Sequence, residues 1–252
     1  ETAMKGTVEF RDVSFRYPNA EENVIEHISF TARRGETTAF IGATGAGKST
    51  LINLIPRFYD VTEGQVLVDG VDVREVKLSD LRDRIGLVPQ KGVLFSGTIE
   101  TNIAYAGNVP DSETVRWAAK IAQADGFINE KPDGYDSEIA QGGTNVSGGQ
   151  RQRLAIARAV AKRPEIYIFD DSFSALDYAT DRALREALQE VAAESTVLIV
   201  AQRISTVLNA DRIIVLDGGR VAGMGTHKEL MENCEEYRQI ALSQLSAEEA
   251  GR

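Results

Sequence analysis

A glycine-rich segment from Gly42 to Thr50, GATGAGKST, holds the residues of this sequence best suited to chemistry. Its glycines allow the backbone to curl so that successive N–H groups point at one phosphate. Lys48 would reach the β- and γ-phosphates, and Ser49 would offer its hydroxyl to Mg²⁺. The alternative is a chance glycine-rich turn, but all four fixed positions of the motif are filled. The segment therefore predicts a P-loop that binds a nucleoside triphosphate.

The flanking elements are those that a P-loop needs. An apolar run over residues 38–41 is typical of a buried strand, and the apolar spacing over residues 50–55 suits a helix. Strand, loop and helix in this order place the loop amides at the positive end of the helix dipole.

Two further strands end in polar side chains. The strand at residues 166–170 is apolar and ends in Asp170, which predicts a carboxylate in the Mg²⁺ shell, although an acid at a strand end can also be structural. The strand at residues 85–90 is stopped by proline and ends in Gln90. Because ligands of open α/β sheets bind at the carboxyl ends of strands, Gln90 is a candidate site residue as well as a possible loop polar group.

A second anion site is predicted near the middle of the chain. Residues 145–150, NVSGGQ, open a long helix that runs to about Lys162. Ser147, Gly148 and Gly149 have an ordinary meaning as a helix cap. They also leave several backbone N–H groups bare beside a positive dipole end, where an anion can bind.

Composition limits the class of protein. The chain has 252 residues, 42% of them apolar, which is enough for a sizeable core. The net charge of −10 argues against nucleic acid as a principal partner. The single cysteine, Cys234, cannot form an internal disulfide, which fits a reducing compartment. No apolar run approaches the roughly 20 residues that span a bilayer, so a membrane role would come through a partner or segments outside this sequence.

The remaining periodicity predicts an α/β fold with a mostly parallel sheet, an antiparallel β subdomain and a helical insertion. We expect one domain over residues 6–252, with a core at about 6–90 and 164–252 and a helical subdomain at about 91–163. Residues 1–5 are expected to be linker or residual expression sequence. The expected strands lie at 7–10, 13–17, 25–32, 65–68, 196–201, 212–216 and 220–221, and the expected helices at 78–84, 98–104, 111–124, 126–130, 179–192 and 226–245. Trp117 is expected to pack against other helices, and His227 to begin a helix.

Taken together, these segments resemble the ATP-binding cassette (ABC) family, specifically the nucleotide-binding domain of an exporter-type transporter. Residues 42–50 match Walker A, residues 166–170 match Walker B, and Gln90 matches the Q-loop. The signature is Val146, Ser147, Gly148, Gly149 and Gln150, and the D-loop runs from Ser174 to Asp177. Residues 94–99 and 225–230 are similar to exporter domains, whereas residues 137–143 depart from the usual exporter pattern.

The resemblance assigns further roles. It implies that Tyr17, otherwise readable as a surface aromatic, stacks on adenine, and that Ser49, Gln90 and Asp170 ligate Mg²⁺. Asp171, Gln202 and Gln90 would be the catalytic residues. The residues expected to bind ATP are Tyr17, Gly42, Thr44, Gly45, Ala46, Gly47, Lys48, Ser49 and Thr50.

The resemblance also implies partners. Two nucleotide-binding domains would sandwich two ATP molecules head to tail, with Ser147 and its glycines acting on the partner's ATP. Transmembrane domains, fused N-terminally in the full protein, would place the domain at the cytoplasmic face of a membrane, although this piece is itself expected to be soluble.

Two departures from the family pattern fall on one composite site. The general base is usually glutamate, but Asp171 is one methylene shorter. A displacement of about 1 Å at such a group lowers the rate roughly a hundredfold. Gln202 stands at the position where the family usually has the switch histidine. Its amide can hydrogen-bond a phosphate but cannot carry a proton. We therefore expect one half of a heterodimeric exporter whose own site hydrolyses slowly.

Two alternatives stay open at this point, and two others lack the features that they require. The chain could form a homodimer that uses Asp171 as a slower base, or it could be a regulatory module that binds ATP without hydrolysis. A soluble ABC ATPase of DNA repair or translation would need a coiled-coil insertion or second cassette and a basic surface. A P-loop kinase would need an acceptor-substrate lid instead of the signature segment.

Overall fold

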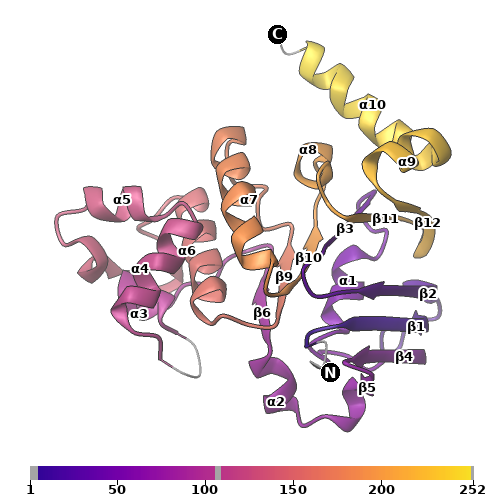
Figure 1. Cartoon of the computed structure of the whole chain (residues 1–252), viewed down its shortest axis with the longest axis horizontal. Helices are drawn as coiled ribbons and strands as arrows, with labels where there is room; N and C mark the ends of the chain where they lie inside the picture. The colour runs from indigo at the N-terminus through magenta and orange to yellow at the C-terminus, as the bar shows by residue number, and fades with distance from the viewer. Residues whose placement is uncertain (1–4, 106–108, 251–252) are drawn as a thin grey trace.

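A six-stranded, mostly parallel sheet lies at the centre of the structure, a computed structural model that describes residues 5–105 and 109–250 (Figure 1). The strand order is β12-β11-β3-β10-β9-β6, and only β12 is antiparallel to its neighbour. The strands are β3 (Thr37–Gly42), β6 (Ile85–Val88), β9 (Ile166–Asp170), β10 (Thr196–Val200), β11 (Arg212–Asp217) and β12 (Arg220–Gly225).

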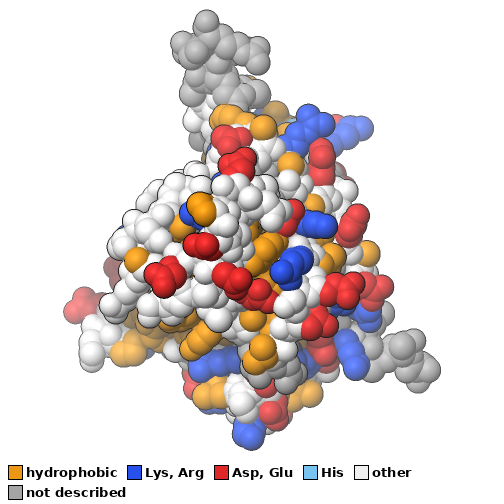
Figure 2. All heavy atoms as spheres, turned by 90° about the vertical axis from the view of Figure 1, so that its left-hand side faces the viewer, with side chains coloured by type: hydrophobic (Ala, Val, Ile, Leu, Met, Phe, Trp, Pro, Cys, Tyr) orange, Lys and Arg blue, Asp and Glu red, His pale blue; other side chains and the backbone are white. Residues whose placement is uncertain are grey.

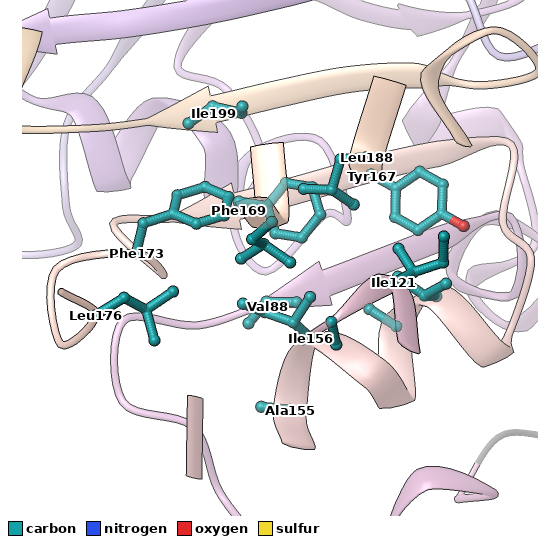
Figure 3. Packing of buried hydrophobic residues seen from close by; sticks show 14 of the residues in the cluster. Val88, Ile121, Ala155, Ile156, Tyr167, Phe169, Phe173, Leu176, Leu188 and Ile199 are labelled. Carbon is teal, nitrogen blue, oxygen red and sulfur yellow. The ribbon is translucent and has the colours of Figure 1, made fainter. Parts of the chain in front are cut away.

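Successive side chains of this sheet point to opposite faces and pack into two hydrophobic cores, one on each face. On β9, Ile166 and Ile168 join one core, while Tyr167 and Phe169 join the other. Figure 3 shows Tyr167, Phe169 and Phe173 in one layer between Ile199 of β10 and Ile156 of the helical region. Packing on both faces fixes the end of β9, where Asp170 begins the site.

The second sheet is antiparallel, with strand order β2-β1-β4-β5. It is formed by β1 (Val8–Phe15), β2 (Ile25–Ala32), β4 (Glu63–Val68) and β5 (Val71–Asp72). The prediction of separate strands at 7–10 and 13–17 was wrong, because β1 is one strand with a shifted register between Phe10 and Val13. Asp12 has a φ of 47° there, so an irregularity, not a turn, interrupts the alternation, and Tyr17 lies beyond the strand end.

Helices fill the segment between β6 and β9, at the left of Figure 1. Asp111 caps the helix that begins at Ser112, where its side chain accepts a hydrogen bond from Thr114 N at 2.8 Å. Trp117 packs against the larger core and lies under Arg163, whose Cζ is 4.5 Å from the ring centroid. The elements are β7 (Gly97–Thr98), α3 (Ile99–Ile103), α4 (Ser112–Ile121), α5 (Asp125–Glu130), η2 (Gly134–Asp136), β8 (Glu138–Ile139), η3 (Gln141–Gly143) and α6 (Gly148–Ala161).

The other helices surround the two sheets. The P-loop leads into α1 (Lys48–Asn53), and α7 (Tyr178–Ala192) connects β9 to β10. His227 begins α9 after its N-cap Thr226, as predicted. The remaining elements are η1 (Val73–Glu75), α2 (Leu78–Asp83), α8 (Ile204–Val207), α9 (His227–Asn233) and α10 (Glu235–Ala250).

The predicted α/β fold class is confirmed, with its parallel and antiparallel sheets. In the described part of the chain, no helix has the length and apolarity needed to cross a bilayer.

Candidate nucleotide site

The P-loop connects β3 to α1 at the carboxyl edge of the central sheet. Gly47, the N-cap of α1, has a φ of 99°, a left-handed conformation that favours glycine. A β-carbon there would lie 2.7 Å from the Ile25 Cγ2 atom, and one on Gly42 would lie 2.3 Å from the Leu216 carbonyl oxygen. Gly47 is therefore required by backbone conformation and by packing, and Gly42 by packing.

Lys48 is buried at the start of α1 and curls toward the loop. Its Nζ atom donates to the carbonyl oxygens of Gly42, at 2.5 Å, and Ala43, at 3.1 Å. Burial lowers the pKa of the Lys48 ammonium, while the nearby carboxylates of Asp171 and Asp170 oppose that effect. The structure thus brings one cation and two carboxylates to the same edge of the sheet.

Ser49 and Asp170, the two predicted metal ligands from Walker A and Walker B, meet directly. The Ser49 hydroxyl donates to Asp170 Oδ1 at 3.0 Å, although the residues are 121 positions apart. Burial raises the pKa of the Asp170 carboxyl, whereas the Ser49 hydrogen bond and the Lys48 charge lower it. Two hard oxygen donors at one point suit Mg²⁺, which takes few protein ligands and completes its shell with phosphate and water.

Asp171 is buried beside this pair and has a φ of 49°, which is uncommon for a residue with a side chain. Its backbone N–H donates to the Val200 carbonyl at 2.8 Å, which holds it against β10. Burial, and secondly the charge of Asp170, raises the pKa of the Asp171 carboxyl. Gln90 Nε2 donates to Asp171 Oδ2 at 3.3 Å, so the structure brings together two of the predicted catalytic residues.

A residue that the sequence did not single out supports Gln90. Gln152, buried in α6, donates from Nε2 to the Gln90 carbonyl at 2.5 Å. This bond links the Q-loop to the helix that the signature opens. Gln152 is flanked in the sequence by Gln150, Arg151 and Arg153, and nothing in that local pattern marks it as buried.

Gln202 and the D-loop lie around one small cavity of about 230 Å³, lined by Asp171, Phe173, Ser174, Ala201, Gln202, Arg203 and Thr206. The Ser174 hydroxyl donates to the Asp171 carbonyl at 3.0 Å. Asp177 caps α7 by accepting from Thr180 N at 2.9 Å, and this hydrogen bond lowers the pKa of the Asp177 carboxyl. The Gln202 side chain is exposed at this opening.

Tyr17 borders a separate open pocket of about 470 Å³. Its hydroxyl shares a hydrogen bond of 2.8 Å with the hydroxyl of Thr50 in α1, so the ring is tied to the P-loop helix. The Tyr59 ring meets Tyr17 edge to face, with centroids 5.2 Å apart. Tyr59 was missed in the sequence, although the Phe58-Tyr59 pair shortly after the P-loop helix was a usable aromatic signal.

The signature segment begins α6 as predicted. Ser147 is an exposed N-cap whose hydroxyl accepts from Gln150 N at 3.1 Å, and Gln150 accepts in return from Ser147 N. Val146 is buried beneath it. A β-carbon on Gly149 would approach the Ala175 carbonyl of the D-loop at 3.2 Å, whereas one on Gly148 would meet nothing within 4 Å. Helix α6 belongs to the helical group at the left of Figure 1, apart from α1.

The surface of the helical region carries mixed charge. Figure 2 shows acidic and basic side chains interspersed with apolar ones on this face, without a single broad basic patch. Such a face offers no continuous track for phosphates of a nucleic acid.

Comparisons with known proteins agree with this geometry. The family model described as ABC transporter matches residues 25–174. The chain is 51% identical over 98% of its length to an uncharacterized ABC transporter ATP-binding protein of Mycobacterium tuberculosis, and covers 43% of that protein. It is 44% identical over 96% of its length to an ATP-dependent lipid A-core flippase of Haemophilus influenzae, of which it covers 41%.

A solved structure is also similar over most of the chain. The structure of a bacterial Atm1-family ABC exporter with ATP bound has a TM-score of 0.91 and 39% identity, with 95% of this chain and 42% of that chain covered. The chain thus spans less than half the length of these relatives. By matched family model, sequence identity and fold, it belongs to the ABC transporter family, as an ATP-binding domain of exporter type.

Proposed function

We propose that this domain binds Mg-ATP at its P-loop and uses ATP-dependent dimerisation to drive transport by a membrane partner. The convergence of Lys48, Ser49 and Asp170 on one edge of the central sheet carries this proposal. Lys48 would leave the Gly42 and Ala43 carbonyls for the β- and γ-phosphates, and the bare loop amides, including those of Thr44 and Gly45, would surround them.

The protein ligands of Mg²⁺ would be Ser49 and Asp170. Gln90 would be a further ligand, because its hydrogen bond to Asp171 keeps its side chain near them. When bound, the ion would neutralise charge on the β- and γ-phosphate oxygens. In the described residues, no group of three or more His, Cys, Asp or Glu side chains could hold a metal. This donor set therefore suits an ion that shares its shell with a nucleotide.

The signature would serve a second chain. Ser147 is exposed, and Gly148 meets no atom of its own chain that would exclude a β-carbon. Close approach of an external group explains a glycine there better than packing does. We infer a head-to-tail dimer in which Ser147 and the amides of Gly148 and Gly149 contact the γ-phosphate on the partner's P-loop.

Hydrolysis at the P-loop of this chain would be slow. Asp171 is a short and buried base, and Gln202 at the neighbouring opening cannot carry a proton. The partner would then be a non-identical domain that supplies its own glutamate and histidine and borrows the signature of this chain. The alternatives are a homodimer that uses Asp171 as a slow base, and a regulatory module without hydrolysis.

Transmembrane segments would complete the transporter. A relative from Bacillus subtilis, 43% identical over 94% of this chain, is named a putative multidrug export ATP-binding/permease protein, and the chain covers 41% of it. We propose that such segments precede this domain, which then lies at the cytoplasmic face of the membrane. The helical subdomain at about 91–163 and the loop at Gln90 would contact them, and nucleic acid would not be a partner.

The direct test is to measure Mg-ATP binding and hydrolysis on the same preparation of this chain. We expect binding that requires Lys48, together with slow single-turnover hydrolysis by the chain alone. A homologous domain with glutamate and histidine at the positions of Asp171 and Gln202 is the control. A chain that fails to bind Mg-ATP contradicts the function, and turnover equal to the control contradicts the impaired site.

Tyr17 gives a separate prediction, about how the adenine base of ATP is bound. Replacing Tyr17 with alanine should weaken Mg-ATP binding about tenfold or more, because base stacking on an aromatic ring contributes about 1–3 kcal/mol. Tyr17→Phe keeps the ring, loses the hydrogen bond to Thr50, and should bind nearly as well as the parent. Equilibrium binding of a fluorescent ATP analogue measures both. Tyr105→Ala, on the exposed helical region, is the control, and equal weakening by it would contradict the assignment.

A further inference from the structure

The carboxy-terminal helix α10 reaches the segment that carries Gln202. Gln244 accepts a hydrogen bond from Ile204 N on Oε1 at 2.7 Å and donates from Nε2 to the Gln202 carbonyl at 2.6 Å. One side-chain amide therefore binds the backbone on both sides of Arg203.

The backbone at this point needs such support. The last strand contact is from Ala201 N to the Phe40 carbonyl at 3.1 Å, and α8 begins only at Ile204. Arg203, the N-cap of α8, makes no capping bond with its side chain. Gln244 satisfies the first N–H of α8 from a distant helix and so takes over the role of a cap.

Arg203 holds the same segment from the opposite side. Its guanidinium donates to the Phe173 carbonyl at 2.6 Å and lies 3.3 Å from Asp181 Oδ2, whose carboxylate is fully buried. The segment at residues 202–204 is thus held to Phe173 and α7 by Arg203, and to α10 by Gln244. The Gln202 side chain projects from this fixed segment to the opening that Asp171 also lines.

Gln244 itself is well anchored. Tyr237, Ala241 and Gln244 follow one another at spacings of four and three residues, which places them on one face of α10. Tyr237 and Ala241 on that face are buried, and the Tyr237 hydroxyl bonds His227 Nδ1 at 2.7 Å. The helix therefore presents the Gln244 amide from a packed surface, as accurate positioning requires.

We propose that Gln244 is a positioning residue for ATP hydrolysis: through the backbone of residues 202–204, α10 sets the pose of the Gln202 side chain toward the γ-phosphate. This inference rests on the proposed function, because it needs Gln202 to face the nucleotide. It adds the carboxy-terminal helix to the elements that control the rate.

A double-mutant cycle tests the proposal, with the parent chain, Gln202→Ala, Gln244→Met and the combination of both. Methionine matches glutamine in length but cannot make either bond. Single-turnover hydrolysis at saturating Mg-ATP should fall about two- to tenfold in Gln244→Met, the equivalent of one or two hydrogen bonds, with ATP affinity unchanged. In the Gln202→Ala background, Gln244→Met should have no further effect.

Gln239→Met is the matched control, because Gln239 is exposed on the same helix and donates to the exposed Glu235. If Gln244→Met does not fold, Gln244→Glu replaces it, since it keeps the acceptor for Ile204 N and loses the donor. An unchanged rate, or an equal loss with and without Gln202, would overturn the positioning role alone. An unchanged rate in Gln202→Ala would overturn the placement of Gln202 at the nucleotide and with it the positioning role, whereas the proposed function is overturned separately, by a chain that does not bind Mg-ATP.

Discussion

Replacing Asp171 with glutamate and Gln202 with histidine together is expected to raise ATP turnover by this chain up to about a hundredfold. The glutamate carboxylate extends one methylene further and would reach an attacking water that lies too far from the aspartate carboxylate. The imidazole would add a group that can carry positive charge beside the γ-phosphate. Steady-state phosphate release by the double variant and by the parent chain measures the effect.

The structure gives the reason for expecting so large a gain. The backbone hydrogen bond from Asp171 N to the Val200 carbonyl fixes the backbone of Asp171. A backbone shift therefore cannot bring its carboxylate closer to the nucleotide. The Asp171 carboxylate accepts a hydrogen bond from Gln90. Only a longer side chain would extend past Gln90 toward the attacking water. Gln202 lines the same opening as Asp171, so we expect the two changes to act on one water and one phosphate.

The matched control makes the same two exchanges on exposed helices, as Asp80→Glu with Gln189→His. It should leave turnover unchanged. If the site variant is no faster than this control, Asp171 and Gln202 do not limit the rate, and the account of an impaired site is wrong.

Replacing Ser147 with arginine is expected to abolish turnover in the Asp171→Glu, Gln202→His background while ATP binding to the P-loop persists. A bulky cation at the start of α6 would obstruct the phosphate of a second chain at this one site and remove the hydroxyl offered to it, while the other site of a dimer stays open if the second chain keeps its serine. Loss of one such donor to developing charge costs about a hundredfold or more in rate. Phosphate release and equilibrium ATP binding, measured in parallel, separate the two effects.

Loss of a helix cap alone must be excluded, since Ser147 also caps α6. Thr226→Arg removes an equivalent capping box from α9 and is the matched control. Each change should cost about 1 kcal/mol of stability, but only the change at Ser147 should stop turnover. A fully active Ser147→Arg chain would contradict the role of the signature.

The candidate nucleotide site at the edge of the sheet was predictable from local patterns. The run ending in Asp170 is short, apolar and bounded, so its strand and its terminal carboxylate follow from sequence. The P-loop glycines and the capping box at Ser147 are likewise signals within a few residues. Parallel pairing of β3, β10 and β9 then brings these strand ends to one edge.

Contacts between distant segments could not be predicted in this way. The bonds from Gln152 to Gln90 and from Gln244 to Gln202 join residues 62 and 42 positions apart. Each depends on how a helix rotates against its neighbour, which periodicity fixes only to within a turn. The irregularity at Asp12 was missed for a related reason, because a register shift depends on pairing with the partner strand. In the sequence, it interrupts the alternation of apolar and polar residues in the same way as a turn does.

Trans-complementation tests most directly whether ATP is held between the P-loop of one chain and the signature of another. Two chains in the Asp171→Glu, Gln202→His background are prepared, one with Ser147→Arg and the other with Lys48→Ala, and each alone should be inactive. A one-to-one mixture should recover about a quarter of the unblocked turnover, because half of randomly formed dimers are mixed and each holds one complete site of two. A mixture as inactive as its components would contradict the account.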